Sequence, residues 1–223
     1  MPDALIIFDC DGVLVDSEPI SLGLLIEHCA KYGLELDLFQ ACDCFLGKPV
    51  SVASAEVNET YQTNVPDVEL DEFQQQILAR FRHELKPVEG VAHALSLVDA
   101  PKCVASSSNL ERIKKSVEFT GLYDFFSKNL FSTDMVARGK PHPDVFLHAA
   151  DQMGFKPRQS VVIEDSPAGL RAAKAAEMKT IAFTGGSHAE AAGLTSKLGA
   201  LSPDQLIDNM NDLPRAIAAL SAH

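Results

Sequence analysis

The eight residues LIIFDCDG at positions 5–12 indicate which fold to expect for this chain. Its first four residues form an unbroken apolar run, as in strands that are buried on both faces of a parallel sheet. Asp9 and Asp11 follow, and because residues i and i+2 of an extended chain point the same way, both carboxylates can face one pocket. Gly12 allows a sharp turn after them. Asp-Gly pairs also form ordinary turns, so this motif alone leaves a site and a simple turn equally open.

Similar apolar runs recur along the chain with helical patterns between them. Runs at 102–105, 160–163 and 180–183 predict strands, and weaker ones lie at 129–131 and 200–201. Apolar residues at spacings of three and four predict helices at 91–98, 113–119, 145–153, 168–176 and 213–220, with a closing helical segment over 208–223. This alternation predicts an α/β fold, a doubly wound parallel sheet with helices on both faces.

The block from residue 17 to residue 86 interrupts the alternation. It carries no convincing strand pattern, only helical segments near 17–32, 50–63 and 69–85. We therefore expect an α/β core made of residues 1–16 and 87–223, with residues 17–86 inserted after the first strand as a small helical cap.

Composition limits the function classes. The chain has 223 residues and a formal net charge of −12, which argues against a nucleic-acid partner but leaves a small anionic substrate possible. No apolar run approaches the length of about 18 residues that crosses a bilayer. The five cysteines are odd in number and lack zinc-ligand spacing, and the first residues lack signal-peptide features. We expect reduced thiols, a cytoplasmic location, no membrane association and a monomer.

A second polar motif follows the run at 102–105. Ser106 comes directly after it, and Ser107 comes next. A hydroxyl and free backbone N–H groups near a helix start can hold phosphate oxygens. Ser108 begins the pattern Ser-Asn-Leu-Glu, which fits a capping box, so we expect Ser108 to cap the next helix.

Two further motifs supply a cation and two acids. Lys140 lies between Gly139 and Pro141 in a loop that two prolines stiffen, where it is either a fixed positive charge or a solvated lysine. Glu164 and Asp165 end the run at 160–163, and paired acids suit a hard cation such as Mg²⁺. The alternative is a helix N-cap at Ser166 followed by Pro167, and both interpretations can hold together.

The order of these motifs resembles that of phosphatases of the haloacid dehalogenase superfamily. Residues 8–18 look like the opening of such enzymes, and residues 139–144 and 163–169 are similar to their third and fourth motifs. The resemblance covers essentially the whole chain, including the inserted helices. It points to the branch that holds β-phosphoglucomutase and the sugar-phosphate phosphatases, such as 6-phosphogluconate phosphatase.

The resemblance implies a Mg²⁺-dependent phosphatase that works through an aspartyl-phosphate. Asp9 would be the nucleophile and Asp11 the general acid and base. The metal site would consist of the carboxylates of Asp9 and Asp165 and the backbone carbonyl of Asp11, with Glu164 binding directly or through water.

The resemblance also implies which residues meet the substrate. Ser106 and Lys140 would hold the transferring phosphoryl group, with Ser107 beside them and Lys140 restraining Asp9. Lys48, in the helical cap, matches a segment that reaches substrate in relatives, although it can equally be a surface lysine in a turn.

The alternatives to a phosphatase differ in the residues that they require. A β-phosphoglucomutase carries a histidine four residues after the position of Ser17, where this chain has Ser21, which favours hydrolysis over mutase activity. Metal-free dehalogenases lack the second aspartate and the acidic pair, and a catalytically silent binding module would not need the intact set. A phosphorylated sugar, sugar alcohol or sugar acid is expected as substrate, and the residues do not choose among them.

Overall fold

The first strand lies in the middle of a parallel sheet. The computed structural model describes residues 4–46 and 50–220, apart from the side chains of residues 50–53. Within these residues the strand order is β3-β2-β1-β4-β5-β6, and every neighbouring pair is parallel. The strands are β1 (Leu5–Phe8), β2 (Lys102–Ser106), β3 (Leu130–Ser132), β4 (Ser160–Glu164), β5 (Lys179–Phe183) and β6 (Gln205–Ile207). The order reverses beside β1, and in open α/β sheets ligands bind at the carboxyl ends of strands at such a point.

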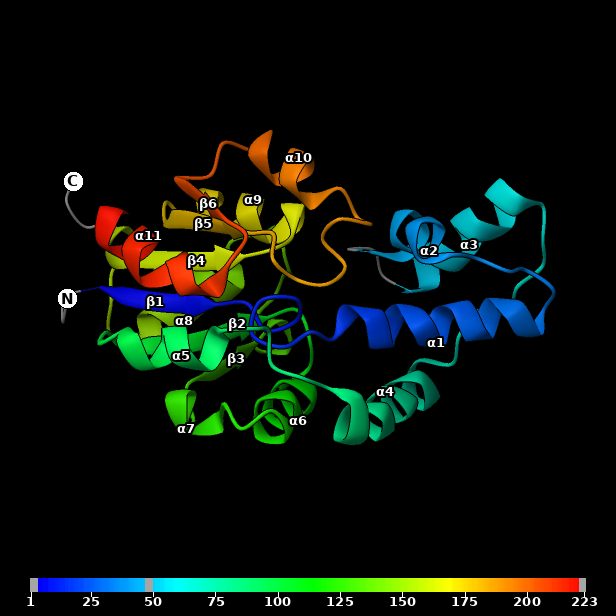
Figure 1. Cartoon of the computed structure of the whole chain (residues 1–223), viewed down its shortest axis with the longest axis horizontal. Helices are drawn as coiled ribbons and strands as arrows, with labels where there is room; N and C mark the ends of the chain where they lie inside the picture. The colour runs from blue at the N-terminus through cyan, green and yellow to red at the C-terminus, as the bar shows by residue number, and fades with distance from the viewer. Residues whose placement is uncertain (1–3, 47–49, 221–223) are drawn as a thin grey trace.

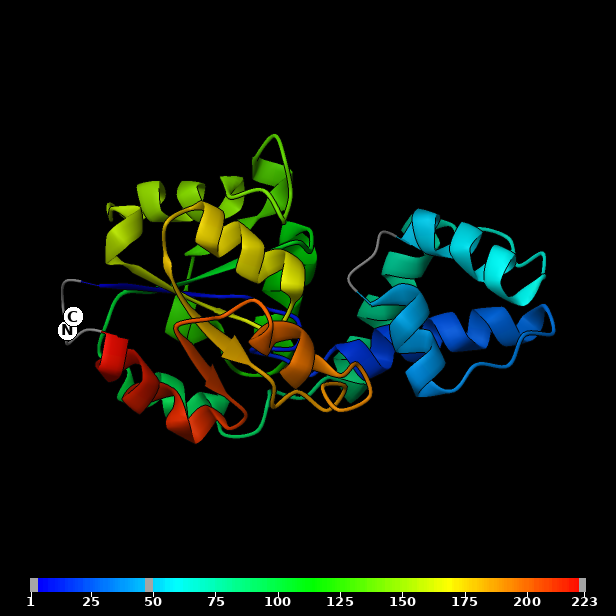
Figure 2. The same ribbon diagram turned by 90° about the horizontal axis from the view of Figure 1, so that it is seen from above.

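Helices cover both faces of this sheet (Figures 1 and 2). They are α5 (Val91–Leu97), α6 (Leu110–Phe119), α7 (Tyr123–Phe126), α8 (Asp144–Gln152), α9 (Pro167–Ala175), α10 (Leu194–Gly199) and α11 (Leu213–Leu220). Short 3₁₀ turns lie at η1 (Thr133–Met135), η2 (Pro157–Gln159) and η3 (Met210–Asp212). Leu5 and Ile7 of β1 pack in a cluster with residues of α8 and α9, whereas Ile6 and Phe8 belong to the cluster with α5, α6 and α11. Successive strand residues therefore fill opposite cores.

The described residues between β1 and α5 form four helices. They are α1 (Glu18–Lys31), α2 (Leu38–Phe45), α3 (Val50–Tyr61) and α4 (Leu70–Glu84), and they form a group beside the α/β part of the molecule (Figures 1 and 2). The two chain segments that join this group to the sheet run side by side, because the Asp16 N–H donates to Lys86 O at 3.0 Å and the Val88 N–H donates to Leu14 O at 3.0 Å. The group thus leaves and rejoins the sheet at one place.

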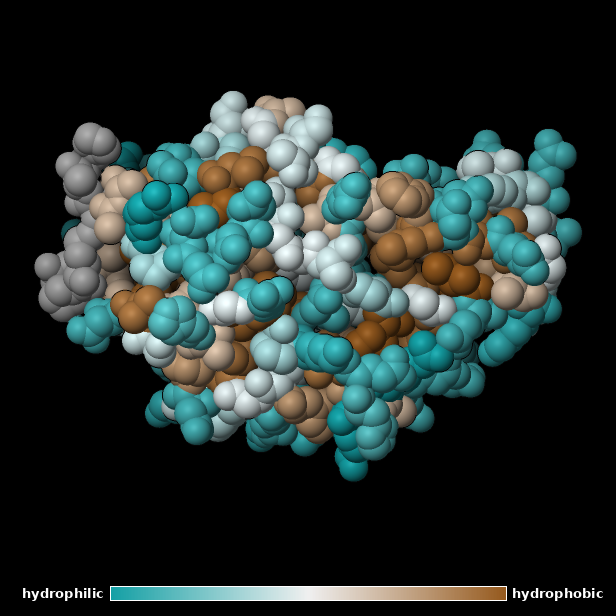
Figure 3. All heavy atoms as spheres, viewed as in Figure 1, coloured by the Kyte–Doolittle hydropathy of each residue, from teal (hydrophilic) through white to brown (hydrophobic). Residues whose placement is uncertain are grey.

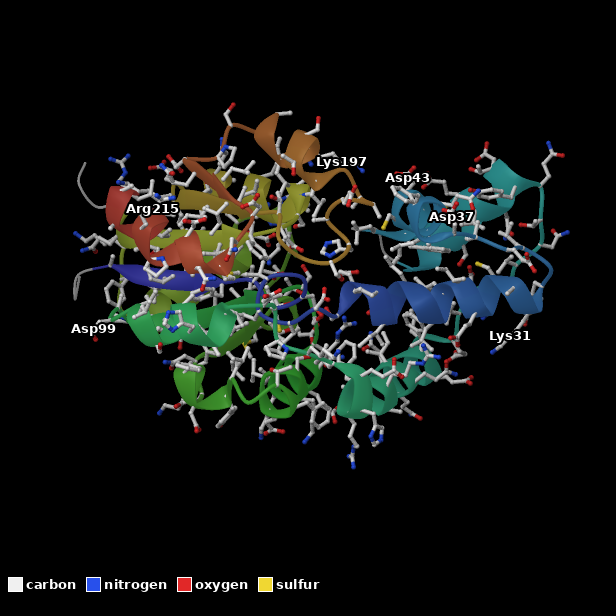
Figure 4. All side chains as sticks on the ribbon, in the orientation of Figure 1. Lys31, Asp37, Asp43, Asp99, Lys197 and Arg215 are labelled. Carbon is white, nitrogen blue, oxygen red and sulfur yellow. The ribbon has the colours of Figure 1, made fainter. Side chains whose placement is uncertain are left out.

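The surface of this helical group is partly apolar. Figure 3 shows hydrophobic residues gathered at the surface around α2, where Leu38 and Phe39 are exposed. Lys197 Nζ of α10 lies 3.9 Å from Asp43 Oδ1 of α2 and so joins this group to the α/β part; both residues are labelled in Figure 4. Both side chains are largely exposed, so this ion pair adds little to stability.

The parallel α/β fold predicted from the sequence is confirmed, with local corrections. Residues 200–201 form a turn instead of a strand. They directly follow α10, which buries Leu194 and Leu198 one helical turn apart and continues to Gly199. The sixth strand is Gln205–Ile207, where Leu206 is exposed and Ile207 is buried. Helices α2, α7 and α10 were not predicted. Among the described residues, no helix is both long and apolar enough to span a membrane.

Candidate active site

The ammonium group of Lys140 binds at the carboxyl end of β1. Lys140 Nζ donates to Asp9 Oδ1 at 2.6 Å, to Glu164 Oε1 at 2.7 Å and to the carbonyl of Ala105 at 3.0 Å. Burial by itself would lower the pKa of Lys140, but the two carboxylates outweigh it and hold the pKa above its usual value. The expected fixed positive charge is therefore what the structure shows, and the solvated-lysine alternative is wrong.

Three buried carboxylates lie together here, and Lys140 contacts two of them. Asp9, Glu164 and Asp165 each offer an oxygen, and these oxygens lie within 4.8 Å of one another. Burial raises the pKa of Asp9 and of Asp165, and the neighbouring carboxylates raise both further, against the opposing effect of Lys140. Three acids that share one cation leave a deficit of positive charge, and a set of carboxylate oxygens fits Mg²⁺.

Two glycines let the acidic residues pack this closely. Glu164 Oε2 accepts from the N–H and the hydroxyl of Ser166, both at 2.9 Å. A Cβ on Gly169 would lie 1.7 Å from Glu164 Oε1, and a Cβ on Gly12 would lie 1.8 Å from Asp165 Oδ2. Gly12 also has φ +77°, which favours glycine. Ser166 accepts from the Gly169 N–H at 3.0 Å and thus caps α9 while Asp165 faces the site, as the sequence predicted.

Asp11 lies in a different environment. Its carboxylate accepts from Ser17 Oγ at 2.6 Å, from Ser108 Oγ at 2.6 Å and from Arg112 Nη2 at 2.8 Å. Burial would raise the pKa of Asp11, but the guanidinium of Arg112 and the two hydroxyl hydrogen bonds together lower it. Asp11 is therefore held as a carboxylate with three donors.

Sequence reasoning misassigned Ser108 and missed Arg112. The N-cap of α6 is Asn109, whose side chain accepts from the Arg112 N–H at 2.8 Å, so Ser108 does not cap the helix and its hydroxyl reaches Asp11. One signal could have pointed to Arg112. A cation in the first turn of a helix is disfavoured by the helix dipole, so another contact must account for its place there.

The predicted substrate-binding residues differ in their placement. Ser106 is buried at the end of β2, and its Oγ accepts from the Ser108 N–H at 3.1 Å. Ser107 is exposed, and its carbonyl accepts from Thr133 Oγ1 at 3.1 Å. Lys48 lies outside the described residues.

A buried histidine adjoins the acidic group. His188 Nε2 lies 3.3 Å from Asp165 Oδ2, and within the described part of the chain His188 Nδ1 has no hydrogen-bond partner. Burial lowers the pKa of His188, which favours the neutral ring. No spacing pattern marks this residue in the sequence, because its contact with Asp165 is made by the fold.

The chain is similar in sequence and in structure to proteins of one hydrolase family. The family model for haloacid dehalogenase-like hydrolases matches residues 4–177. The chain is 29% identical over 184 residues to a 6-phosphogluconate phosphatase of Escherichia coli (strain K12), covering 82% of this chain and 83% of the relative. It is 30% identical over 185 residues to a fructose-1-phosphate phosphatase of the same organism, covering 79% and 94%. A crystal structure of a haloacid dehalogenase-like protein of unknown function from Agrobacterium tumefaciens superposes with a TM-score of 0.89 at 34% identity, covering 99% and 100%.

The chain belongs to the haloacid dehalogenase-like hydrolases. The family that the motifs predicted is therefore confirmed, and the parallel sheet matches the fold of its relatives.

Proposed function

We propose that this protein is a Mg²⁺-dependent phosphatase that hydrolyses a small phosphorylated sugar, sugar alcohol or sugar acid through a phosphoryl group on Asp9. The observation that carries the proposal is the buried group of Asp9, Glu164 and Asp165 at the carboxyl ends of β1 and β4, with Lys140 bonded to Asp9 and Glu164. The relatives named as phosphatases of 6-phosphogluconate and fructose 1-phosphate support the class of substrate.

Asp9 is the proposed nucleophile. A carboxylate that approaches a phosphate meets a repulsion of about 4 kcal/mol per charge pair at ~4 Å in a partly solvated site. Lys140, fixed 2.6 Å from Asp9, offsets part of this repulsion before the substrate arrives. Asp9, Asp165 and the carbonyl of Asp11, with Glu164 directly or through water, would hold Mg²⁺, which supplies further positive charge to the phosphoryl oxygens.

Asp11 is the proposed acid and base. It would first take up a proton, against the pKa-lowering effect of Arg112 and the two hydroxyls, and would give this proton to the leaving alcohol. It would then take a proton from the water that attacks the aspartyl-phosphate. Ser106, Ser107 and Lys140 would bind the phosphoryl oxygens, and Lys48 would contact the rest of the substrate.

Residues 17–86 are the proposed helical cap on a core of residues 1–16 and 87–223. Helices α1–α4 follow the carboxyl end of β1 directly and adjoin Asp11 through Ser17, which supports a role in covering the site and in selecting the leaving group. We propose a cytoplasmic monomer that acts on small molecules, without nucleic-acid or membrane partners. Ser21, in place of the histidine of the mutases, supports hydrolysis over phosphoryl transfer to a second sugar.

Phosphate release from a panel of sugar, sugar-alcohol and sugar-acid phosphates tests the proposal. We expect turnover with Mg²⁺ that is lost with EDTA and does not need an added sugar bisphosphate, whereas a mutase would need one. Asp9→Asn should lower kcat by about 10⁴-fold. The exposed Asp134→Asn, the same chemical change away from the site, should keep the wild-type rate. Wild-type activity in Asp9→Asn would overturn the mechanism.

A further inference from the structure

The side chain of Arg112 joins the acid-base group to two cap helices. It extends from α6, and its Nη2 donates to Asp11 Oδ1 at 2.8 Å and to Ser21 Oγ of α1 at 3.4 Å. Its guanidinium carbon lies 5.1 Å from the ring centroid of Phe81 on α4. The bond to Ser21 is long, so Asp11 and the ring of Phe81 are its main contacts.

These contacts restrict the guanidinium group of Arg112. Arg112 is only 11% exposed, and the ring of Phe81 beneath it is buried. Because the guanidinium group is planar and rigid, a fixed ring face on one side and a carboxylate at its edge leave it little freedom. Arg112 Nε is buried without a hydrogen-bond partner among the described residues, which is unfavourable. The side chain is therefore placed to suit Asp11 and not to satisfy all of its own donors.

A second arginine shows that helix packing does not require this burial. Arg82 of α4 lies over the ring of Phe119 of α6, with its guanidinium carbon 5.9 Å from the centroid. Arg82 is exposed, and no described contact joins it to the site. The same pair of helices thus carries one arginine–phenylalanine contact that reaches the site and one that does not.

We propose that Arg112 is a positioning residue for hydrolysis, which holds the Asp11 carboxylate in an orientation set by helices α1 and α4. The inference rests on the acid-base role proposed for Asp11. A shift of α4 against α6 moves the ring of Phe81, and the guanidinium that stacks on it moves relative to Asp11. The orientation of the acid-base group therefore depends on the position of the cap helices.

Arg112→Met and the matched control Arg82→Met test this role in steady-state and single-turnover assays. We expect Arg112→Met to lower kcat for a sugar phosphate by about 100-fold, the usual contribution of a general acid, while KM changes less than about threefold. Arg112→Lys keeps the charge without the planar fork and should be intermediate. Phe81→Leu, which touches no site carboxylate, should lower kcat in the same direction. Arg82→Met should match the wild type.

A leaving-group comparison separates positioning from a merely structural role. p-Nitrophenyl phosphate has a leaving group that needs no protonation, so its single-turnover cleavage should fall less in Arg112→Met than that of a sugar phosphate. Equal losses for both substrates, or a change in KM alone, would overturn the proposal. If the wild type releases no phosphate at all, the proposed function fails instead. Crystal structures of the wild type and Arg112→Lys then test the positioning alone, and an unmoved Asp11 carboxylate would refute it.

Discussion

Asp9 and Asp11 are two residues apart, yet their surroundings are opposite. At Asp9, three buried carboxylates lie together and the ammonium of Lys140 bonds two of them, and burial with like charges raises the pKa of Asp9. At Asp11, one carboxylate has three donors that overcome burial and lower its pKa. The Asp9 region carries more negative than positive charge and is suited to bind a cation. The carboxylate of Asp11 is already neutralised by its donors, so it needs no metal ion, and the donors can fix its orientation instead.

The largest effect should come from removing the only described cation of the Asp9 region. Lys140→Met keeps the side-chain length but leaves three buried carboxylates uncompensated. Breaking a buried ion pair costs about 3–5 kcal/mol, and we expect a loss of that size in the free energy of unfolding at neutral pH with EDTA present. Denaturant titration measures it. The exposed Lys128→Met should change stability by less than about 0.5 kcal/mol, and an equally small change in Lys140→Met would contradict the comparison.

The effect of Mg²⁺ on stability should distinguish the Asp9 region from the Asp11 region. We expect Mg²⁺ at 100 times its dissociation constant to raise the free energy of unfolding of the wild type by about 2.7 kcal/mol, because it binds only the folded acidic group. Asp165→Asn should lose this increment. Asp11→Asn should keep it, because the proposed ligand from Asp11 is its backbone carbonyl.

The measurement is the difference in unfolding free energy with Mg²⁺ and with EDTA for each protein, so the separate cost of each substitution cancels. A Mg²⁺ increment that survives in Asp165→Asn, or that disappears in Asp11→Asn, would contradict the assignment of the metal site to the carboxylates of the Asp9 region.

A smaller effect should follow from removing one donor of Asp11. Ser108→Ala takes away a hydroxyl that donates to a carboxylate, and hydrogen bonds to charged groups contribute about 1.5–3 kcal/mol. We expect a loss of about 2 kcal/mol in denaturant titrations near pH 7. Ser107→Ala is the adjacent control, since Ser107 is exposed, and should change stability by less than about 0.5 kcal/mol. Equal effects of the two would mean that Asp11 does not depend on its donors.

The Asp9 region could be predicted from the sequence, whereas much of the Asp11 region could not. Unbroken apolar runs fix β1 and β4, and parallel strands bring their carboxyl ends together, so Asp9 and Asp165 had to meet. The edge strand β6 escaped notice because it is short and partly exposed, so its apolar signal is weak.

Arg112 could not be paired with Asp11 from local pattern. The two are 101 residues apart, and the pairing depends on how α6 packs beside the turn that follows β1. Ser108 and the three residues after it fit a capping box, so the sequence predicts a helix cap at Ser108. The structure shows that Asn109 caps α6 instead. Contacts that strand order imposes were thus predictable, and contacts that side-chain direction decides were not.

The buried thiol of Cys103 shows what burial does to a pKa without neighbouring charges. Cys103 of β2 is fully buried opposite Ile7 of β1, and burial alone raises its pKa. An unfolded thiol ionises above about pH 8.5, while the folded one stays protonated. The resulting stability is complete below that pH and is lost, by about 1.4 kcal/mol per pH unit, as the pH rises toward the folded pKa.

Cys103→Ala removes this dependence and leaves only a constant cavity cost. In denaturant titrations from pH 7 to pH 10, the stability difference between wild type and variant should be constant at first and then shrink above about pH 8.5. Parallel curves over the whole range would mean that burial alone does not shift this pKa, and the raised pKa of Asp9 would then have to come from its neighbouring carboxylates.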